Sequence, residues 1–142
     1  MNFILTEASI HKTKLNDITN LGIRASIGVI FIIQGSGKFG LGFVSMLEKI
    51  GLPIEMQIPI ALAEVISGTL VIIGILTRIS ASLMAIIMLG AIFYVKHASN
   101  LTGNGGYALD LVILACALMI IAVGPGRASL AHVIKKLPRC LH

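Results

Sequence analysis

Residues 58–76 read IPIALAEVISGTLVIIGIL, and the single ionisable residue among them is Glu64. At about 1.5 Å per residue, a helix of this length spans close to the hydrocarbon thickness of a bilayer, about 30 Å. A charge at that depth costs about 2.5–3.5 kcal/mol even on a lenient insertion scale, so it is kept where a partner or a task offsets the cost. We therefore expect a specific role for Glu64.

The composition of the whole chain assigns it to the membrane. Charged residues make up 12% of the 142 residues, and the mean hydropathy is +0.98. Soluble domains carry about 25% charged residues. Three further apolar runs cover residues 21–37, 79–95 and 107–123. The sequence therefore predicts an all-α fold, an antiparallel bundle of four transmembrane helices in residues 19–126, between an N-terminal tail (1–18) and a C-terminal tail (127–142).

Small residues predict where these helices pack closely. Gly28 and Gly35 lie one heptad apart on one helical face, and Ala81 and Ala85 form a similar face on the third run. Side chains this small let two helix backbones approach each other in a membrane. The link at residues 74–78 is short, so the second and third spans should form a tight antiparallel hairpin.

The distribution of basic residues predicts the orientation. With four spans, both termini lie on one side of the membrane, together with eight Lys and Arg residues, while three lie on the other side. The two sets are Lys12, Lys14, Arg24, Arg78, Arg127, Lys135, Lys136 and Arg139 against Lys38, Lys49 and Lys96. By the positive-inside rule, both termini are cytoplasmic and the protein lies in the cell membrane. The basic residues flank spans without interleaved aromatics, which argues against a nucleic-acid partner.

Two segments outside the spans have amphipathic periodicity. Residues 43–50 predict a short interfacial or re-entrant helix in the first loop. Residues 129–137 predict a basic amphipathic helix, which would lie on anionic lipids of the cytoplasmic leaflet. The chain starts without the basic and apolar regions of a secretory signal, so we expect the N-terminal tail to be retained.

The predicted topology brings polar residues together at the outer end of the bundle. Gln34 and Lys38 end the first span, Glu64 lies about 9 Å below the start of the second, and His97 follows the third. Asp110 lies about one turn into the fourth span. These five residues form the predicted polar cluster.

Three interpretations of this cluster are open. Glu64 pairs with Lys38 or accepts a hydrogen bond from Gln34 and so holds the helices together, as intramembrane charges commonly do. Alternatively, the cluster lines a binding site for a quinone or a similar molecule, with Glu64 and His97 exchanging protons. In the third, His97, Glu64 and Asp110 bind a metal ion, but metal-ligand spacings such as HxxxH are absent from the sequence, and we predict neither a metal nor a covalent cofactor.

The order of these landmarks resembles the DoxX family. The resemblance covers residues 20–131, and its motifs are Arg24 and Gly28, GSGKF at 35–39, GLP at 51–53, Glu64 with Ser67 and Gly68, GILTR at 74–78 and GPGRASL at 124–130. It implies a four-helix membrane bundle associated with membrane oxidoreductase complexes, some of them linked to quinones.

Some of the candidate site residues match the family pattern, and others depart from it. Lys38 and Glu64 stand at positions that match the family. Asp110 stands later than the acidic residue that often follows the glycine and tyrosine opening the fourth span, and Ala131 replaces the aspartate that usually closes the last motif. No catalytic residue is transferred, so we expect a chain that is not catalytic by itself.

Together these observations predict a small subunit of a membrane-bound oxidoreductase complex, which interacts with quinone or handles protons through the polar cluster. Its partners would be other membrane protein subunits. Two alternatives remain open: a purely structural subunit that packs on its partners through small-residue faces, and a small proton-coupled transporter.

Overall fold

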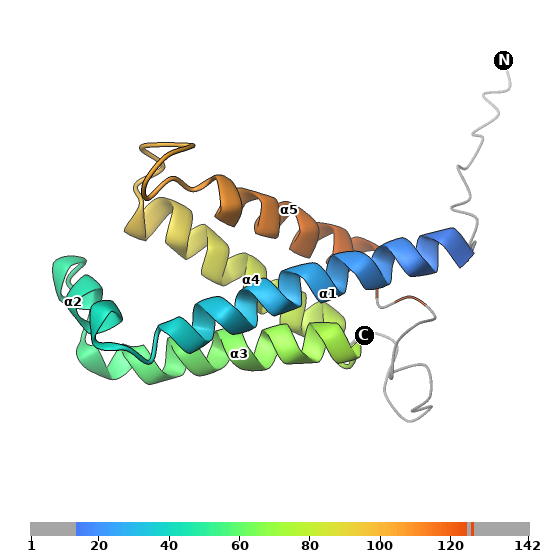
Figure 1. Cartoon of the computed structure of the whole chain (residues 1–142), viewed down its shortest axis with the longest axis horizontal. Helices are drawn as coiled ribbons and strands as arrows, with labels where there is room; N and C mark the ends of the chain where they lie inside the picture. Colours follow the sequence, from blue (N-terminus) through green and yellow to red (C-terminus); the bar gives the residue numbers. More distant parts are fainter. Residues whose placement is uncertain (1–13, 125, 127–142) are drawn as a thin grey trace, which may run out of the picture.

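The computed structural model describes residues 14–124 and 126, and within these residues the protein is all-α, as predicted (Figure 1). Its elements, in chain order, are α1 (Lys14–Gly37), α2 (Leu41–Lys49), the 3₁₀ turn η1 (Ile54–Met56), α3 (Gln57–Ile73), α4 (Thr77–Gly90), the π-helical turn η2 (Ala91–Val95) and α5 (Ala108–Val123). The predicted C-terminal helix at 129–137 lies outside the described residues.

Three helical segments of the described chain are long and apolar enough to cross a membrane. They are Lys14–Gly37 with 24 residues, Ile54–Ile73 with 20 and Thr77–Val95 with 19. Helix α5 has 16 residues, which correspond to about 24 Å of helix, less than a hydrocarbon core of about 30 Å. A complete crossing by α5, and with it the topology of four spans, stays a prediction.

The helices form two antiparallel pairs that pack on each other. Helix α1 packs mainly on α3, α4 packs mainly on α5, and contacts between α3 and α4 join the pairs. Figure 1 shows α1, α3, α4 and α5 running alternately in opposite directions, so that the start of α1 and the end of α5 lie at the same end. At this end Asn20 Nδ2 donates a hydrogen bond of 3.1 Å to the Gly124 carbonyl. Helix α2 and the connection from η2 to α5 lie at the opposite end.

The core is apolar and receives side chains from all four long helices. Its fully or almost fully buried members are Ile27, Phe31, Val71, Ala81, Met84, Ala85, Met88, Ile113, Ala117 and Ile120. Ala81 and Ala85, predicted as a small-residue face, are therefore part of this core. The opposite faces of the helices expose large aliphatic side chains, as expected of helices surrounded by lipid.

Glycines bring α1 and α3 into backbone contact. An added Cβ on Gly28 would lie 2.7 Å from the Gly68 carbonyl oxygen, and one on Gly35 would lie 2.9 Å from the Ala61 carbonyl oxygen. Gly28 and Gly35 are separated by one heptad on α1, and Ala61 and Gly68 by one heptad on α3. The small-residue face predicted on the first span therefore has α3 as its partner.

Arg24 stabilises the C-terminus of α3. The guanidinium is buried, and its Nε and Nη2 donate hydrogen bonds of 3.0 and 3.1 Å to the carbonyls of Val71 and Ile72. Carbonyls in the last turn of a helix lack intrahelical partners and carry the negative end of the helix dipole. Gly74 then ends α3 with φ 83°, a conformation that glycine adopts at little cost. Arg24 contributed to the predicted orientation, but its contact with α3 was not predicted.

One predicted boundary differs from the structure by several residues, and one segment differs in its helix type. Helix α1 begins at Lys14, before the apolar run that starts at Leu21, because a helix can extend beyond its apolar segment and Asp17 suits its first turn. The third span ends in the π-helical turn η2, which hydropathy does not distinguish from α-helix. A short helix in the first loop was predicted, and α2 occupies this position; its contact with the membrane interface stays a prediction.

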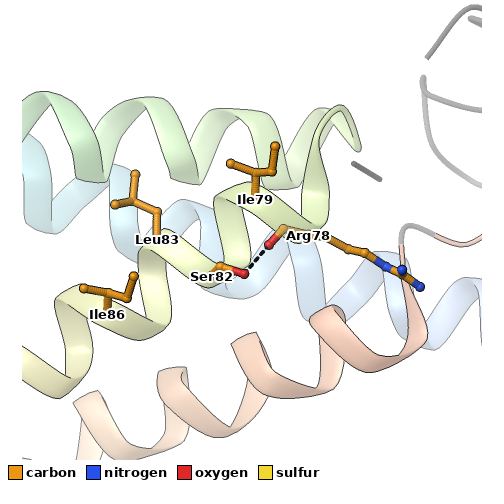
Figure 2. Close-up of a pocket in the computed structure, with 5 residues that line it drawn as sticks. All are labelled: Arg78, Ile79, Ser82, Leu83 and Ile86. Carbon is orange, nitrogen blue, oxygen red and sulfur yellow. Dashed lines mark hydrogen bonds between the residues drawn. The ribbon is translucent and has the colours of Figure 1, made fainter. Parts of the chain in front are cut away.

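A shallow groove runs along the outer face of α4 near its N-terminus (Figure 2). Its volume is about 390 Å³, and Arg78, Ile79, Ser82, Leu83 and Ile86 line it. Ser82 Oγ donates a hydrogen bond of 2.7 Å to the backbone carbonyl of Arg78. All five residues belong to one helix, so the groove is a feature of the surface and does not reach the core.

We expect Gly28→Ala to weaken the pairing of α1 with α3. Its Cβ would lie 2.4 Å from Ile72 Cγ1 as well as 2.7 Å from the Gly68 backbone oxygen, and overpacking of this kind costs about 1–3 kcal/mol. The free energy of unfolding, measured by titrating the purified protein with sodium dodecyl sulfate in mild-detergent micelles, should fall by that amount.

Gly22→Ala is the matched control, because a Cβ on Gly22 of the same helix meets nothing within 4 Å. Alanine is the better helix former by about 1 kcal/mol, so this variant should be as stable as the original or slightly more stable. Equal stability of both variants would contradict the proposed backbone contact.

Candidate functional site

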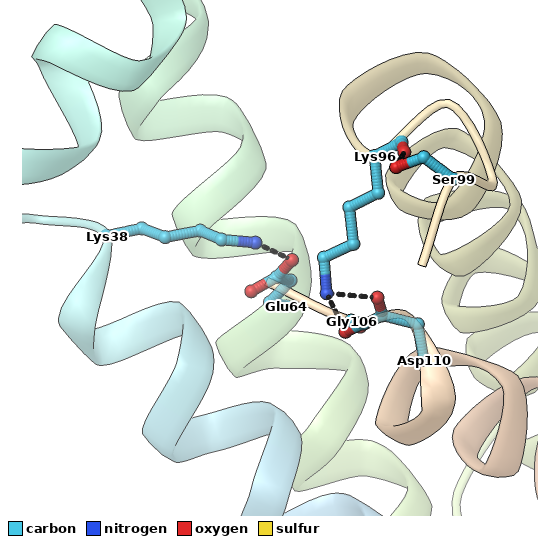
Figure 3. Close-up of polar contacts among 6 residues, drawn as sticks. All are labelled: Lys38, Glu64, Lys96, Ser99, Gly106 and Asp110. Atoms are coloured by element: carbon cyan, nitrogen blue, oxygen red, sulfur yellow. Dashed lines mark hydrogen bonds and ion pairs between the residues drawn. The ribbon is translucent and has the colours of Figure 1, made fainter. Parts of the chain in front are cut away.

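Two ion pairs lie at the end of the molecule that holds α2 and the connection from η2 to α5. Lys38 Nζ pairs with Glu64 Oε1, and Lys96 Nζ pairs with Asp110 Oδ2 at 2.6 Å. Figure 3 shows both lysine side chains reaching inward from the ends of their helices toward the two carboxylates. Four elements therefore meet at this site, two from each antiparallel pair of helices.

Lys38 is positioned by the turn that follows α1. Its backbone N–H bonds to the Gly35 carbonyl at 3.1 Å. Gln57, the first residue of α3, donates from Nε2 to the carbonyls of Lys38 and Gly40 at 2.9 and 3.2 Å. The Lys38 ammonium also lies 5.3 Å from the ring centre of Phe43 on α2, within the range of a cation–π interaction. The ammonium is thus held between α2 and α3.

The π-helical turn positions Lys96. The N–H of Lys96 bonds to the Ala91 carbonyl at 3.0 Å, a spacing of five residues. His97 and Ala98 follow with φ values of 50° and 49°, a left-handed conformation that is uncommon outside glycine. Single π turns and such backbone strain are found frequently at functional sites. Here they turn the chain so that Lys96 points back toward α5.

Lys96 also fixes the start of α5. Its Nζ donates to the Gly106 carbonyl at 2.9 Å in addition to Asp110. Gly106 has no room for a side chain, because a Cβ there would lie 2.7 Å from the Leu101 carbonyl oxygen. One ammonium therefore links η2, the connecting segment and the first turn of α5.

The carboxylates of the site are more deeply buried than the lysines. Glu64 is completely buried, and the side chain of Asp110 is 7% exposed, while the lysine side chains are 24% and 27% exposed. A buried charge requires a counter-charge to be tolerated. Each carboxylate has one, so the two ion pairs together carry no net charge.

The ion pair with Lys38 uses one carboxylate oxygen of Glu64, Oε1. Oε2 is buried and has no hydrogen-bond partner within residues 14–124 and 126. Buried carboxylate oxygens nearly always accept at least one hydrogen bond. Glu64 therefore has the capacity to accept a further hydrogen bond or a proton. The Asp110 carboxylate lies close enough to act on Glu64 electrostatically.

A cavity of about 720 Å³ lies beside the ion pairs. Its polar lining consists of Gln34, Lys38, Tyr94, Lys96 and Asp110, and its apolar lining consists of Phe43, Met46, Leu47, Ile50, Leu52, Met56, Ile60, Ile86, Ile87, Met88, Gly90, Ala91 and Val95. Cavities of about 300–1,000 Å³ with apolar walls and a few polar groups are typical of small-molecule sites. The volume and the lining suit an amphipathic ligand.

The predicted cluster is only partly brought together. Lys38, Glu64 and Asp110 lie at the ion pairs, and Gln34 lines the cavity. His97 is exposed after η2 and does not line the cavity. The described residues contain no group of three His, Cys, Asp or Glu side chains that could hold a metal ion, so the set of His97, Glu64 and Asp110 is not assembled there.

Lys96 is the site residue that the sequence analysis did not select. Its position at the outer end of the third span was recognised, but its pairing with Asp110 was not. Two signals pointed to it: Asp110 needs a partner in an apolar segment, and Lys96 stands at the same end of the neighbouring helix. Tyr94 also lines the cavity, and its hydroxyl lies 3.4 Å from the Ile50 carbonyl.

The fold and the site define a small helical protein with membrane-spanning segments and an amphipathic cavity at one end. The family model of DoxX matches residues 19–97, a range that includes Lys38, Glu64 and Lys96 and ends before Asp110. The chain belongs to the DoxX family, which confirms the resemblance seen in the sequence, and it is a membrane protein.

Curated relatives support this assignment. The chain is 36% identical over 110 residues to the putative oxidoreductase CatD of Bacillus subtilis, and the matched region covers 76% of this chain and 81% of CatD. It is 32% identical over 131 residues to the uncharacterized membrane protein Rv3486 of Mycobacterium tuberculosis, with 80% of each chain covered. A Haemophilus influenzae protein is 38% identical over 78 residues, covering 53% of this chain and 50% of the relative. No solved structure matches the chain significantly.

We expect Lys38→Met to destabilise the protein, because it leaves the buried Glu64 without its cation. The loss should be about 3 kcal/mol, the lower end of the range for breaking a buried pair, because Lys38 is partly exposed. The same detergent titration measures the free energy of unfolding.

Two further variants separate this effect from the loss of a lysine as such. Lys38→Met combined with Glu64→Leu should recover most of the stability, because no unpaired charge remains. Lys49→Met removes an exposed lysine of α2 and should change the stability by less than about 0.5 kcal/mol. A double variant as unstable as the single one would show that the ion pair is not the cause.

Proposed function

We propose that this protein is a small integral membrane subunit of a membrane-bound oxidoreductase complex, and that its cavity binds a quinone. The observation that carries the proposal is the cavity of about 720 Å³, which has long apolar walls and two ion pairs at its polar end. The similarity to a putative oxidoreductase, CatD, supports the reaction class. In this proposal all four long helices cross the cell membrane, with both termini cytoplasmic.

The residues that line the cavity fit the chemistry of a quinone. A quinone head group has two carbonyl oxygens, which accept hydrogen bonds, and an apolar ring and tail. Each lysine ammonium has three N–H donors; Lys96 uses two of them on Gly106 and Asp110 and keeps one. Gln34 adds an amide donor to the same lining. The aliphatic and aromatic walls offer an apolar surface for the ring and tail.

The carboxylates would supply proton acceptors: Asp110 in the cavity lining, and Glu64 behind Lys38, which lines the cavity. A bound quinone takes up two electrons and two protons when it is reduced. Glu64 has a buried oxygen with acceptor capacity to spare within the described residues, and Asp110 lies on the cavity wall. These residues would hold and pass protons, while the redox centres that supply electrons belong to partner subunits. The chain itself would not be catalytic alone.

Filling the cavity tests quinone binding by this chain. Gly90 lines the cavity, and a Cβ added there meets nothing within 4 Å, so Gly90→Phe places a ring in the cavity without a backbone clash. We expect it to weaken the binding of decylubiquinone to the purified chain in lipid nanodiscs by about tenfold or more, measured by equilibrium dialysis.

Gly22→Phe is the matched control for this experiment. Gly22 is also an exposed helical glycine with open space around it, and it does not line the cavity. This variant should bind decylubiquinone as tightly as the original chain. The assignment of a quinone to the cavity would be contradicted if both phenylalanine variants bound decylubiquinone equally well, or if the original chain did not bind it.

Glu64→Gln tests the proton-handling role within the assembly. The complex is isolated through a tag on this chain, and its rate of electron transfer to decylubiquinone is measured. The amide keeps the shape of Glu64 but cannot take up a proton in the same way, so the rate should fall at least tenfold while the subunits stay together. Glu48→Gln, which alters an exposed residue of α2, should leave the rate unchanged.

The same experiment distinguishes the two alternatives. A purely structural subunit would copurify with its partners and show an unchanged rate after Glu64→Gln. A proton-coupled transporter would purify without redox partners and drive substrate-dependent proton flux in vesicles that contain this chain alone.

A further inference from the structure

The groove on α4 lies toward the opposite end of the protein from the ion pairs and has a different character. Its five lining residues come from successive turns of one helix, with Arg78 in the first turn (Figure 2). It shares only Ile86 with the cavity described above. Its volume of about 390 Å³ is large enough for part of a small amphiphile.

Arg78 places a positive charge at one end of this groove, and no carboxylate of the described residues forms an ion pair with it (Figure 2). Both ion pairs of the described chain use lysines, at Lys38 and Lys96. The Nε of Arg78 is buried and has no hydrogen-bond partner within the described residues. The hydrogen bond between Ser82 and Arg78 uses the backbone carbonyl of Arg78 and leaves the guanidinium uninvolved. A buried donor of this kind is rarely left unsatisfied in a native protein.

The surroundings of Arg78 favour a phosphate group. The planar guanidinium donates two parallel hydrogen bonds to phosphate oxygens, which a lysine does not reproduce. Arg78 also lies in the first turn of α4, where the helix dipole attracts anions. The positive charge of Arg78 and the N-terminus of α4 therefore both favour the binding of an anion.

Below Arg78 the groove is apolar. Ile79, Leu83 and Ile86 follow each other at helical spacing and are between 38% and 66% exposed. Figure 2 shows these three side chains along the outer side of α4, next to the groove. A molecule that matches the whole groove has an anionic phosphate at one end and a hydrocarbon chain at the other.

We propose that this groove binds one anionic phospholipid, with its phosphate at Arg78 and an acyl chain along Ile79, Leu83 and Ile86. The guanidinium has no ion-pair partner among residues 14–124 and 126, so its charge complementarity with a phosphate selects an anionic lipid over a zwitterionic one. The site is independent of the quinone cavity, so neither proposal requires the other.

The test compares two lipids with identical acyl chains, phosphatidylglycerol and phosphatidylcholine. Each is titrated into the full chain, purified in mild detergent, and lipid-bound protein is counted by native mass spectrometry. We expect one phosphatidylglycerol to bind about fivefold more tightly than phosphatidylcholine, the effect of one basic residue at an anionic lipid. Arg78→Gln should abolish the difference, while Arg78→Lys should keep part of it.

Control variants isolate the groove from the rest of the surface. Lys14→Gln removes an exposed cation at the same end but outside the groove and should keep the preference for phosphatidylglycerol. Leu83→Trp fills the groove and should weaken phosphatidylglycerol binding about tenfold, whereas Ile66→Trp, on the exposed face of α3, should not. The Arg78 side chain takes part in neither ion pair of the described residues, so we expect its variants to unfold like the original chain, which the detergent titration checks.

Three outcomes would overturn the proposal. The first is Arg78→Gln binding phosphatidylglycerol as tightly as the original chain. The second is equal binding of the two lipids by the original chain. The third is full competition by glycerol 3-phosphate, which would show that the site takes a phosphate group without using the apolar part of the groove.

Discussion

The contact line between α1 and α3 is the constraint on which the rest of the structure depends. Along this line Arg24 meets Val71 and Ile72, Gly28 meets Gly68, Gly35 meets Ala61, and Lys38 meets Glu64. The glycines set a short distance between the two backbones, and each basic side chain then reaches its acceptor on α3. Arg24 neutralises the carbonyl end of α3, and Lys38 neutralises its buried acid. A larger distance between α1 and α3 at the glycines would therefore weaken both the Arg24 hydrogen bonds and the ion pair of Lys38 with Glu64.

In the second pair of helices, α4 and α5, a buried carboxylate is also neutralised by a lysine, but a change in the backbone positions that lysine. Asp110 lies in the first turn of α5, and its partner Lys96 comes from the end of the neighbouring helix. A regular α-helix up to Lys96 would place this residue on another face. The π-helical turn, with its bond from Lys96 to Ala91, changes the register just before the lysine. The two ion pairs thereby come to lie beside one cavity between the pairs of helices.

The sequence predicted the features that depend on local composition. Apolar runs located the ends of the long helices to within about three residues, except that α1 begins at Lys14 and not at Leu21. The lone Glu64 in an apolar segment pointed to the region of the site. The features it did not predict depend on geometry between elements. The capping role of Arg24 requires the antiparallel alignment of α1 with α3, and the pairing of Lys96 with Asp110 requires the π turn. His97 was grouped with the site because it follows the third span at the outer end of the bundle, but the left-handed backbone at His97 accompanies an exposed side chain.

Charge balance separates the two candidate binding sites by ligand class. At the cavity, Lys38 and Lys96 are each neutralised by a carboxylate, so a ligand there meets hydrogen-bond donors without a net positive charge. An anion would have to compete with Glu64 and Asp110 for these lysines, whereas an uncharged quinone would not. At the groove, the buried donor of Arg78 has no acceptor within the described chain, and an anion meets no competing carboxylate in the groove lining. The same residue chemistry, a cation beside apolar side chains, thus favours a neutral ligand at one end of the protein and an anionic lipid at the other.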